Sequence, residues 1–123
     1  MNIQQFYDFC LAKKGVEETF PFDEDTLVFK VGGKMFALTS LRDWENGSPA
    51  VNLKCDPQRS EALRLEHEDI NPGYHMSKIH WNTVRINGDV PSALLKDLIN
   101  HSYDLVLKSL AKKMQKEISE SVD

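Results

Sequence analysis

A pair of glycines between two β-prone runs is the sequence feature that most constrains the fold. Residues 26–31 read Thr-Leu-Val-Phe-Lys-Val, residues 34–39 read Lys-Met-Phe-Ala-Leu-Thr, and Gly32-Gly33 separates them. Two residues that both tolerate positive φ specify a tight two-residue hairpin. The two strands must then be antiparallel, which excludes a parallel doubly wound sheet at this point. Because Met35 and Phe36 point to opposite sides, we expect one face to be core and the other to be partly covered.

Helix signals frame this hairpin. Three helices are expected: over residues 3–14, from Asp56-Pro57 to near Glu68, and from Pro91 to about Ile118. Asn2 is a typical N-cap for the first helix, with Gln5 three positions later as in a capping box. Asp at the N-cap followed by Pro at the first helical position is typical of a helix start.

Two further strands are expected, over residues 50–55 and 81–87, with residues 16–25, 41–49 and 70–73 as connections and turns. The predicted order is therefore α-β-β-β-α-β-α. Strands that run together between isolated helices indicate an α+β fold, here an antiparallel sheet covered on one face by three helices. We expect one domain over residues 1–118 and a frayed tail over residues 119–123.

The overall composition narrows the classes of protein. The 123 residues carry a formal net charge of -4, which argues against a strongly basic nucleic-acid binder. No apolar stretch approaches the ~20 residues of a membrane span, and the first residues lack a secretory signal, so we expect a cytoplasmic protein without membrane contact. Cys10 and Cys55 are expected to be reduced, mostly buried thiols. A disulfide between them is the alternative, since the sequence does not give their distance in space.

The net charge hides an uneven distribution, because residues 70–88 contain no acid. The same stretch holds two cations, two imidazoles and two large aromatic rings, namely Lys78, Arg85, His75, His80, Tyr74 and Trp81. Cations interleaved with aromatic rings suit the phosphates and bases of a nucleic acid. The set also suits a peptide or small-ligand groove, and Trp81 also fits a core position with His80 as its hydrogen-bonded neighbour.

Chemistry-bearing motifs are absent from the sequence. It has no phosphate-binding loop, no nucleophile elbow and no zinc-ligand spacing, so we expect no metal, no cofactor and no enzymatic activity. Five acids within residues 17–25 favour a solvated acidic loop over a cation site, since they lack the order of a calcium loop. A small-ligand or enzymatic site around His80 and Cys55 is a further alternative.

Several motifs together resemble one family. They are Lys14-Gly15, residues 29–37, residues 53–57, residues 72–84 and Ser102-Tyr103. On these features, over about residues 2–114, the chain resembles the MmcQ/YjbR-like family of small bacterial proteins. Ser77 departs from the pattern, because Asn is more usual there.

The resemblance implies an α+β domain with an antiparallel sheet, similar to CyaY-like or secretion-chaperone architectures. It supplies no catalytic residues, and it implies DNA binding through a double-wing arrangement. On that hypothesis the nucleic-acid-binding residues are Lys78, His80, Trp81 and Arg85, joined by Lys34 from the hairpin. The alternative hypothesis is a protein-interaction or chaperone-like module that binds a protein partner or a second copy of the chain.

Overall fold

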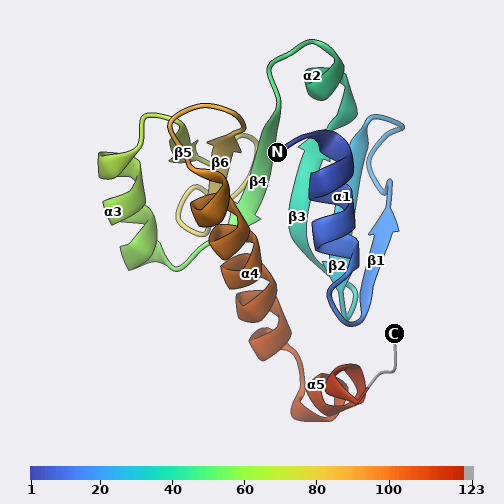
Figure 1. Ribbon diagram of the computed structural model, residues 1–123. Helices are drawn as coiled ribbons and strands as arrows, with labels where there is room; N and C mark the ends of the chain where they lie inside the picture. Colours follow the sequence, from blue (N-terminus) through green and yellow to red (C-terminus); the bar gives the residue numbers. More distant parts are fainter. Residues whose placement is uncertain (121–123) are drawn as a thin grey trace.

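The computed structural model describes residues 1–120, which form a single six-stranded antiparallel sheet with helices (Figure 1). The strands are β1 (Val16–Thr19), β2 (Thr26–Val31), β3 (Lys34–Ser40), β4 (Ala50–Lys54), β5 (Ile70–Pro72) and β6 (Trp81–Arg85). They lie side by side in the order β1-β2-β3-β4-β6-β5. The helices are α1 (Ile3–Leu11), α2 (Leu41–Glu45), α3 (Pro57–Glu66), α4 (Ser92–Ser109) and α5 (Lys112–Ser119).

The predicted class is confirmed, but the predicted count of three helices and the predicted element order are wrong. Within residues 1–120 there are five helices and six strands. β1 and β5 occupy stretches predicted as a connection and a turn, because short edge strands show little alternation of apolar and polar residues. α2 has only five residues, too few for a helical repeat to be visible. Residues 121–123 of the predicted tail lie outside the described residues.

The predicted final helix is two helices, because the chain turns extended at Leu110 and Ala111, with ψ near 160° and 144°. This break lets α5 cross the tip of the β2–β3 hairpin. Gly32 lies so close to Leu110 that a Cβ there would come within 2.4 Å of its side chain. No helix among residues 1–120 is both long and apolar enough to cross a membrane.

The predicted hairpin turn and the predicted N-caps of the first two long helices are confirmed. Gly32 and Gly33 take φ values of 58° and 80°, as a tight two-residue hairpin requires. Asn2 and Gln5 form the expected capping box on α1. The Asp56 side chain accepts a hydrogen bond from Arg59 N at the start of α3. These elements need few distant contacts, which is why sequence alone places them.

One face of the sheet is sealed by α1 and α4, which pass in front of it in Figure 1. The core on this side includes Phe6 from α1 with Phe29 and Phe36 from the hairpin, all fully buried. A β-bulge places Phe36 opposite no partner, since Phe29 pairs with Ala37 and Lys30 pairs with Met35. Phe36 packs in the core beneath the helices and Met35 packs on the other side of the sheet, so the two point to opposite sides, as predicted.

The hydroxyl group of Ser102 ties α4 to the middle of the sheet. Its Oγ donates to the carbonyl of Phe36 at 2.5 Å and accepts from the backbone N of Lys54 at 2.9 Å. The next side chain, Tyr103, donates its hydroxyl hydrogen to the carbonyl of Lys14 at 2.5 Å. The Ser102-Tyr103 motif thus connects α4 to β3, β4 and the turn between α1 and β1.

We predict that Ser102→Ala lowers the free energy of unfolding by about 1–3 kcal/mol, because it leaves a buried carbonyl and a backbone N–H unpaired. Urea unfolding followed by circular dichroism measures this. Ser109→Ala is the matched control on the same helix, since the Ser109 hydroxyl is exposed and bonds only the carbonyl of Val106. Equal losses in both variants would contradict the prediction.

Candidate binding site on the open face of the sheet

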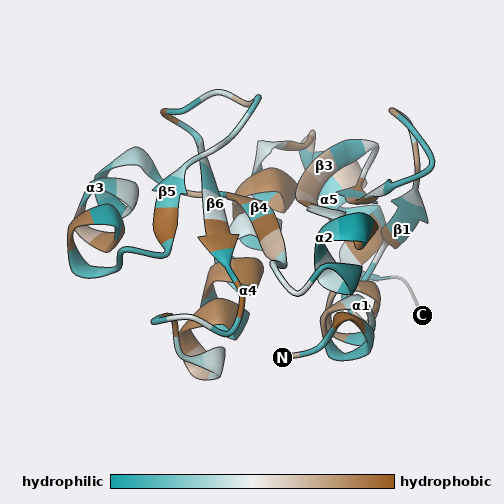
Figure 2. Ribbon diagram, turned by 90° about the horizontal axis from the view of Figure 1, so that it is seen from above, coloured by the Kyte–Doolittle hydropathy of each residue, from teal (hydrophilic) through white to brown (hydrophobic). Residues whose placement is uncertain are grey.

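On the sheet face opposite α1 and α4 no helix of residues 1–120 packs, and we call it the open face. Figure 2 shows two loops standing on this side: the first loop (residues 20–25), between β1 and β2, and the second loop (residues 73–80), between β5 and β6. A small apolar cluster lies at its centre. It contains Val28, Leu38 and Trp81, with Met35 and Met76 packed against them.

A cleft of about 580 Å³ opens on this face. Phe22 of the first loop lines it on one side, and Tyr74 and His75 of the second loop line it on another. Strand residues Met35, Leu38, Ser40, Asn52 and Thr83 also contribute to its lining. A neighbouring hollow of about 520 Å³ shares Asp43, Ala50, Tyr74 and Thr83 with it and extends to Arg85. Together they form a groove across the strands.

The acids of the first loop shape its backbone. Asp23 Oδ1 accepts from the backbone N of Asp25 at 2.9 Å and of Thr26 at 2.6 Å, and the bond from Thr26 lowers the pKa of Asp23. The Asp25 carboxylate accepts from Ser40 Oγ at 2.6 Å and from Arg42 N at 2.7 Å. These contacts hold the loop while the Phe22 side chain stays 62% exposed.

Close backbone packing anchors the two ends of the second loop. Gly73 N donates to the carbonyl of Trp81 at 2.8 Å, and a Cβ on Gly73 would lie only 2.8 Å from Trp81 Cβ. Arg64 of α3 donates from Nε to Asn82 Oδ1 at 2.8 Å and from Nη2 to the carbonyl of Lys78 at 2.6 Å. Within the loop, His75 has a φ of 60°, a conformation that costs energy for a non-glycine residue.

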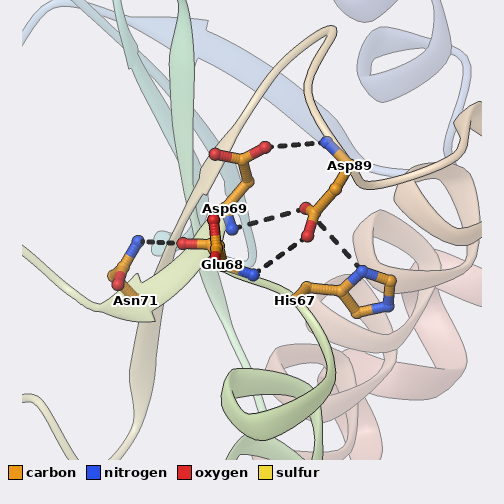
Figure 3. Close-up of polar contacts among 5 residues, drawn as sticks. All are labelled: His67, Glu68, Asp69, Asn71 and Asp89. Atoms are coloured by element: carbon orange, nitrogen blue, oxygen red, sulfur yellow. Dashed lines mark hydrogen bonds and ion pairs between the residues drawn. The ribbon is translucent and has the colours of Figure 1, made fainter.

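A carboxylate clasp holds the β5 end of the sheet (Figure 3). Asp89 accepts from the backbone N of Glu68 at 2.9 Å and of Asp69 at 3.3 Å, while its own N donates to Asp69 Oδ2 at 2.7 Å. His67 Nδ1 lies 3.7 Å from Asp89 Oδ1. Glycine is required at position 88, next to Asp89, because a Cβ there would lie only 1.9 Å from Asp69 Oδ2. Residues 1–120 contain no cluster of three or more His, Cys, Asp or Glu side chains that could hold a metal ion.

The residues predicted to bind nucleic acid do not form one surface. Trp81 is only 8% exposed and packs in the central cluster, so its ring is not available for stacking on a base. Lys78 and His80 are exposed in the second loop, and Arg85 is exposed on β6 opposite Ala50. Lys34 pairs across the hairpin with Val31, whose side chain is in the core beneath the helices. Lys34 therefore belongs to the opposite face.

Two lysines that we did not single out from the sequence lie on the open face. Lys54 is the cross-strand partner of Trp81, and Lys30 is the partner of Met35. Because directly paired residues share a face, both lysines flank the central cluster. Alternation along β4 places Lys54 on this face, whereas β2 has three consecutive buried residues, so only the strand pairing places Lys30 there.

None of the open-face cations has a carboxylate partner. The ion pairs within 4.0 Å in the described part of the chain are Arg59–Asp97 and His67–Asp89. Lys30, Lys54, Lys78 and Arg85 therefore keep their charges for an external anion. Glu17, opposite Lys30 on β1, is an acidic neighbour that offsets part of this charge.

Neither thiol is arranged as a nucleophile. Burial raises the pKa of Cys10 to about 12 and also raises the pKa of Cys55. A raised pKa leaves little thiolate at neutral pH. Both side chains are buried, at 0% and 3% exposure.

We predict that both thiols react slowly with a disulfide reagent at pH 8 in the folded protein and at the ordinary rate in urea, because unfolding removes the burial that raises their pKa. Absorbance of the released thiolate measures the rate. The variants Cys10→Ser and Cys55→Ser assign the signal to each residue. Fast native labelling of Cys55 would contradict its buried, protonated state.

We predict that Arg64→Ala loosens the second loop and lowers the free energy of unfolding by about 1–3 kcal/mol, because the carbonyl of Lys78 and the amide of Asn82 lose a charged donor. Hydrogen exchange of residues 73–80 measures the loosening. Arg59→Ala is the control on the same helix, since Arg59 pairs with Asp97 away from the loop. Equal exchange of the loop in both variants would argue against this role.

Comparisons with known proteins bear on the family. The YjbR family profile matches residues 11–105. The chain is 47% identical over 104 residues to the uncharacterized protein YbdF of Escherichia coli O157:H7, covering 84% of this chain and 82% of that protein. It is 34% identical over 116 residues to the uncharacterized protein YjbR of Escherichia coli K12, covering 94% and 96%.

Solved structures agree with this relationship. A crystal structure of a Deinococcus radiodurans protein with a DUF419 domain matches with a TM-score of 0.87 at 42% identity, over 96% of this chain and 88% of that one. A Pseudomonas syringae crystal structure matches with a TM-score of 0.73 at 31% identity, over 86% and 99%. Profile, sequence identity and fold therefore agree, and the chain belongs to the YjbR family.

Proposed function

We propose that this protein is a nucleic-acid-binding module that uses the open face of its sheet. The observation that carries the proposal is that four cations lie on the same side of the sheet as the groove and have no carboxylate within 4.0 Å among residues 1–120. They are Lys30, Lys54, Lys78 and Arg85, of which Arg85 lines the groove. Phosphate binding by lysine and arginine supplies most of the affinity of such modules, and it needs charges that the protein itself leaves unpaired.

Charge on the open face differs from the charge of the whole chain. Lys78 and Arg85 lie within the acid-free stretch of residues 70–88, and Lys54 lies on β4, the strand that pairs with β6. Asp43 is the acid that lines the groove, whereas Asp23 and Asp25 are occupied in holding the first loop. A net charge of -4 therefore does not prevent local binding, but it limits the affinity to a modest, salt-sensitive value.

The shape of the open face also supports the proposal. The two loops stand on the same side of the sheet (Figure 2), and we assign them as the two wings of the arrangement that the family resemblance implies. Each loop presents an exposed aromatic ring, with Phe22 at 62% and Tyr74 at 72% exposure. Exposed rings beside cations suit nucleic acids, because bases stack on the rings while phosphates contact the cations.

A protein-interaction or chaperone-like role is the second candidate, and exposed apolar side chains on the loops favour it. Phe20 is 45% exposed and Ile79 is 65% exposed. Strand addition is disfavoured, since edge strand β1 carries Glu17 and Glu18, and edge strand β5 has three residues that end in Pro72. Light scattering that shows a dimer, and a monomer after Ile79→Ser, would favour this candidate.

We predict that labelled DNA binds at low salt and dissociates as salt rises, because counterions compete for the phosphates. Fluorescence anisotropy of duplex and single-stranded DNA at several salt concentrations measures this. Lys54→Ala together with Lys78→Ala should reduce the slope of log affinity against log salt by about 2, since each lysine that neutralises a phosphate adds about 1 to the slope.

Lys96→Ala is the matched control, because Lys96 is an exposed lysine of α4, the helix that covers the other face. The proposal fails if no DNA binds at low salt, or if binding is insensitive to salt. It also fails if Lys96→Ala changes the slope as much as Lys54→Ala or Lys78→Ala does.

A further inference from the structure

We infer that the groove takes a single nucleic-acid strand and that one unstacked base enters the cleft between the two loops. This inference rests on the proposed function and adds the class of its ligand. It concerns the groove formed by the cleft and the adjoining hollow, which share Asp43, Ala50, Tyr74 and Thr83.

The position of the cleft favours a single strand. Its lining includes Met35 and Leu38 on the sheet itself, between loops that stand up on either side (Figure 2). A duplex keeps its bases paired and stacked, so it presents phosphates and base edges but no free base face. In a single strand the bases are unpaired and can be splayed out onto protein side chains. Only such a strand brings a flat group to this depth.

The ring pair of the second loop offers a stacking surface. Tyr74 and His75 have ring centroids 4.0 Å apart, and both residues are exposed. His75 holds a φ of 60°, so backbone strain is retained at this rim of the cleft. Phe22 provides a second aromatic ring from the first loop. Aromatic rings on two sides suit a base, which has two π-faces.

Polar groups in the cleft suit the edge of a base. Asn52 Oδ1 accepts from Thr83 Oγ1 at 2.5 Å, and Thr83 Oγ1 in turn accepts from Tyr74 N at 3.1 Å. This chain directs the amide oxygen of Asn52 toward Thr83 and leaves Asn52 Nδ2 without a protein acceptor among residues 1–120. Asp43 adds a carboxylate acceptor at the rim. A base edge carries both acceptors and donors and can pair with both groups.

The cations lie at both ends of the strands that form the groove. Arg85 pairs with Ala50 at one end of β4 and β6, and Trp81 pairs with Lys54 at the other. The two charged residues are four positions apart along the strands, or about 13 Å at about 3.3 Å per residue. A phosphate beside an inserted base would therefore meet Arg85 in the hollow, and a phosphate displaced along β4 would meet Lys54.

Fluorescence anisotropy with three labelled 12-nucleotide probes tests the inference: a single strand, its duplex, and a single strand with abasic sites throughout its centre. We predict that at one low salt concentration the single strand binds about tenfold more tightly than the other two. Tyr74→Ala and Phe22→Ala should each weaken binding of the single strand about tenfold and leave duplex binding unchanged, because each removes a stacking ring.

Two variants control for effects of substitution outside the groove and for loss of the fold. Leu65→Ala removes a side chain that is 89% exposed on α3 outside the groove, and it should change nothing. Tyr74→Phe keeps the ring and should retain the affinity, which separates stacking from loss of fold. Circular dichroism confirms that each variant is folded.

The outcomes separate this inference from the proposed function. Salt-sensitive binding of single strand and duplex with equal affinity overturns the inference and leaves the proposed function standing. Equal affinity of the abasic probe also overturns it, because phosphates alone then explain the binding. No binding of any probe at low salt overturns both.

Discussion

The hydroxyl group of Ser102 holds the layers of this protein together. It donates to a carbonyl of β3 and accepts from an N–H of β4, so it joins the longest helix to two adjacent strands at a fully buried point. Once α4 is held there, α4 and α1 cover one face of the sheet (Figure 1). The other face is then left to loops alone, and the groove is a consequence of that asymmetry.

Residues that look functional in the sequence divide into buried residues that build the second loop and exposed residues on the open face. Trp81 and Asn82 support the second loop: the carbonyl of Trp81 receives Gly73 N, and Asn82 is held by Arg64. Lys54 gains its importance from position, because it flanks Trp81 on the open face without an ion pair. Part of the motif over residues 72–84 is therefore explained by the contacts that build the second loop.

Much of the fold was predictable because its signals are local. The Gly32-Gly33 turn and the caps of α1 and α3 depend on backbone conformations that a few neighbouring residues decide. β1, β5 and α5 were not predictable in the same way, since each is short and is held by contacts with distant residues. For the candidate site, the acid-free stretch pointed to the second loop, but the first loop and Lys30 emerged only from the pairing of the strands.

An α+β domain with an antiparallel hairpin follows from the order of the residues alone, because turn and cap chemistry act within a few positions. The absence of acids from residues 70–88 is likewise a property of the sequence. In contrast, three features appear only in the folded chain: the burial of Trp81, the placement of Lys34 and Lys54 on opposite faces, and the lining of one cleft by two loops that are far apart in the sequence. Exposure and shared faces follow from strand order and helix coverage, which are set by contacts between residues far apart in the chain.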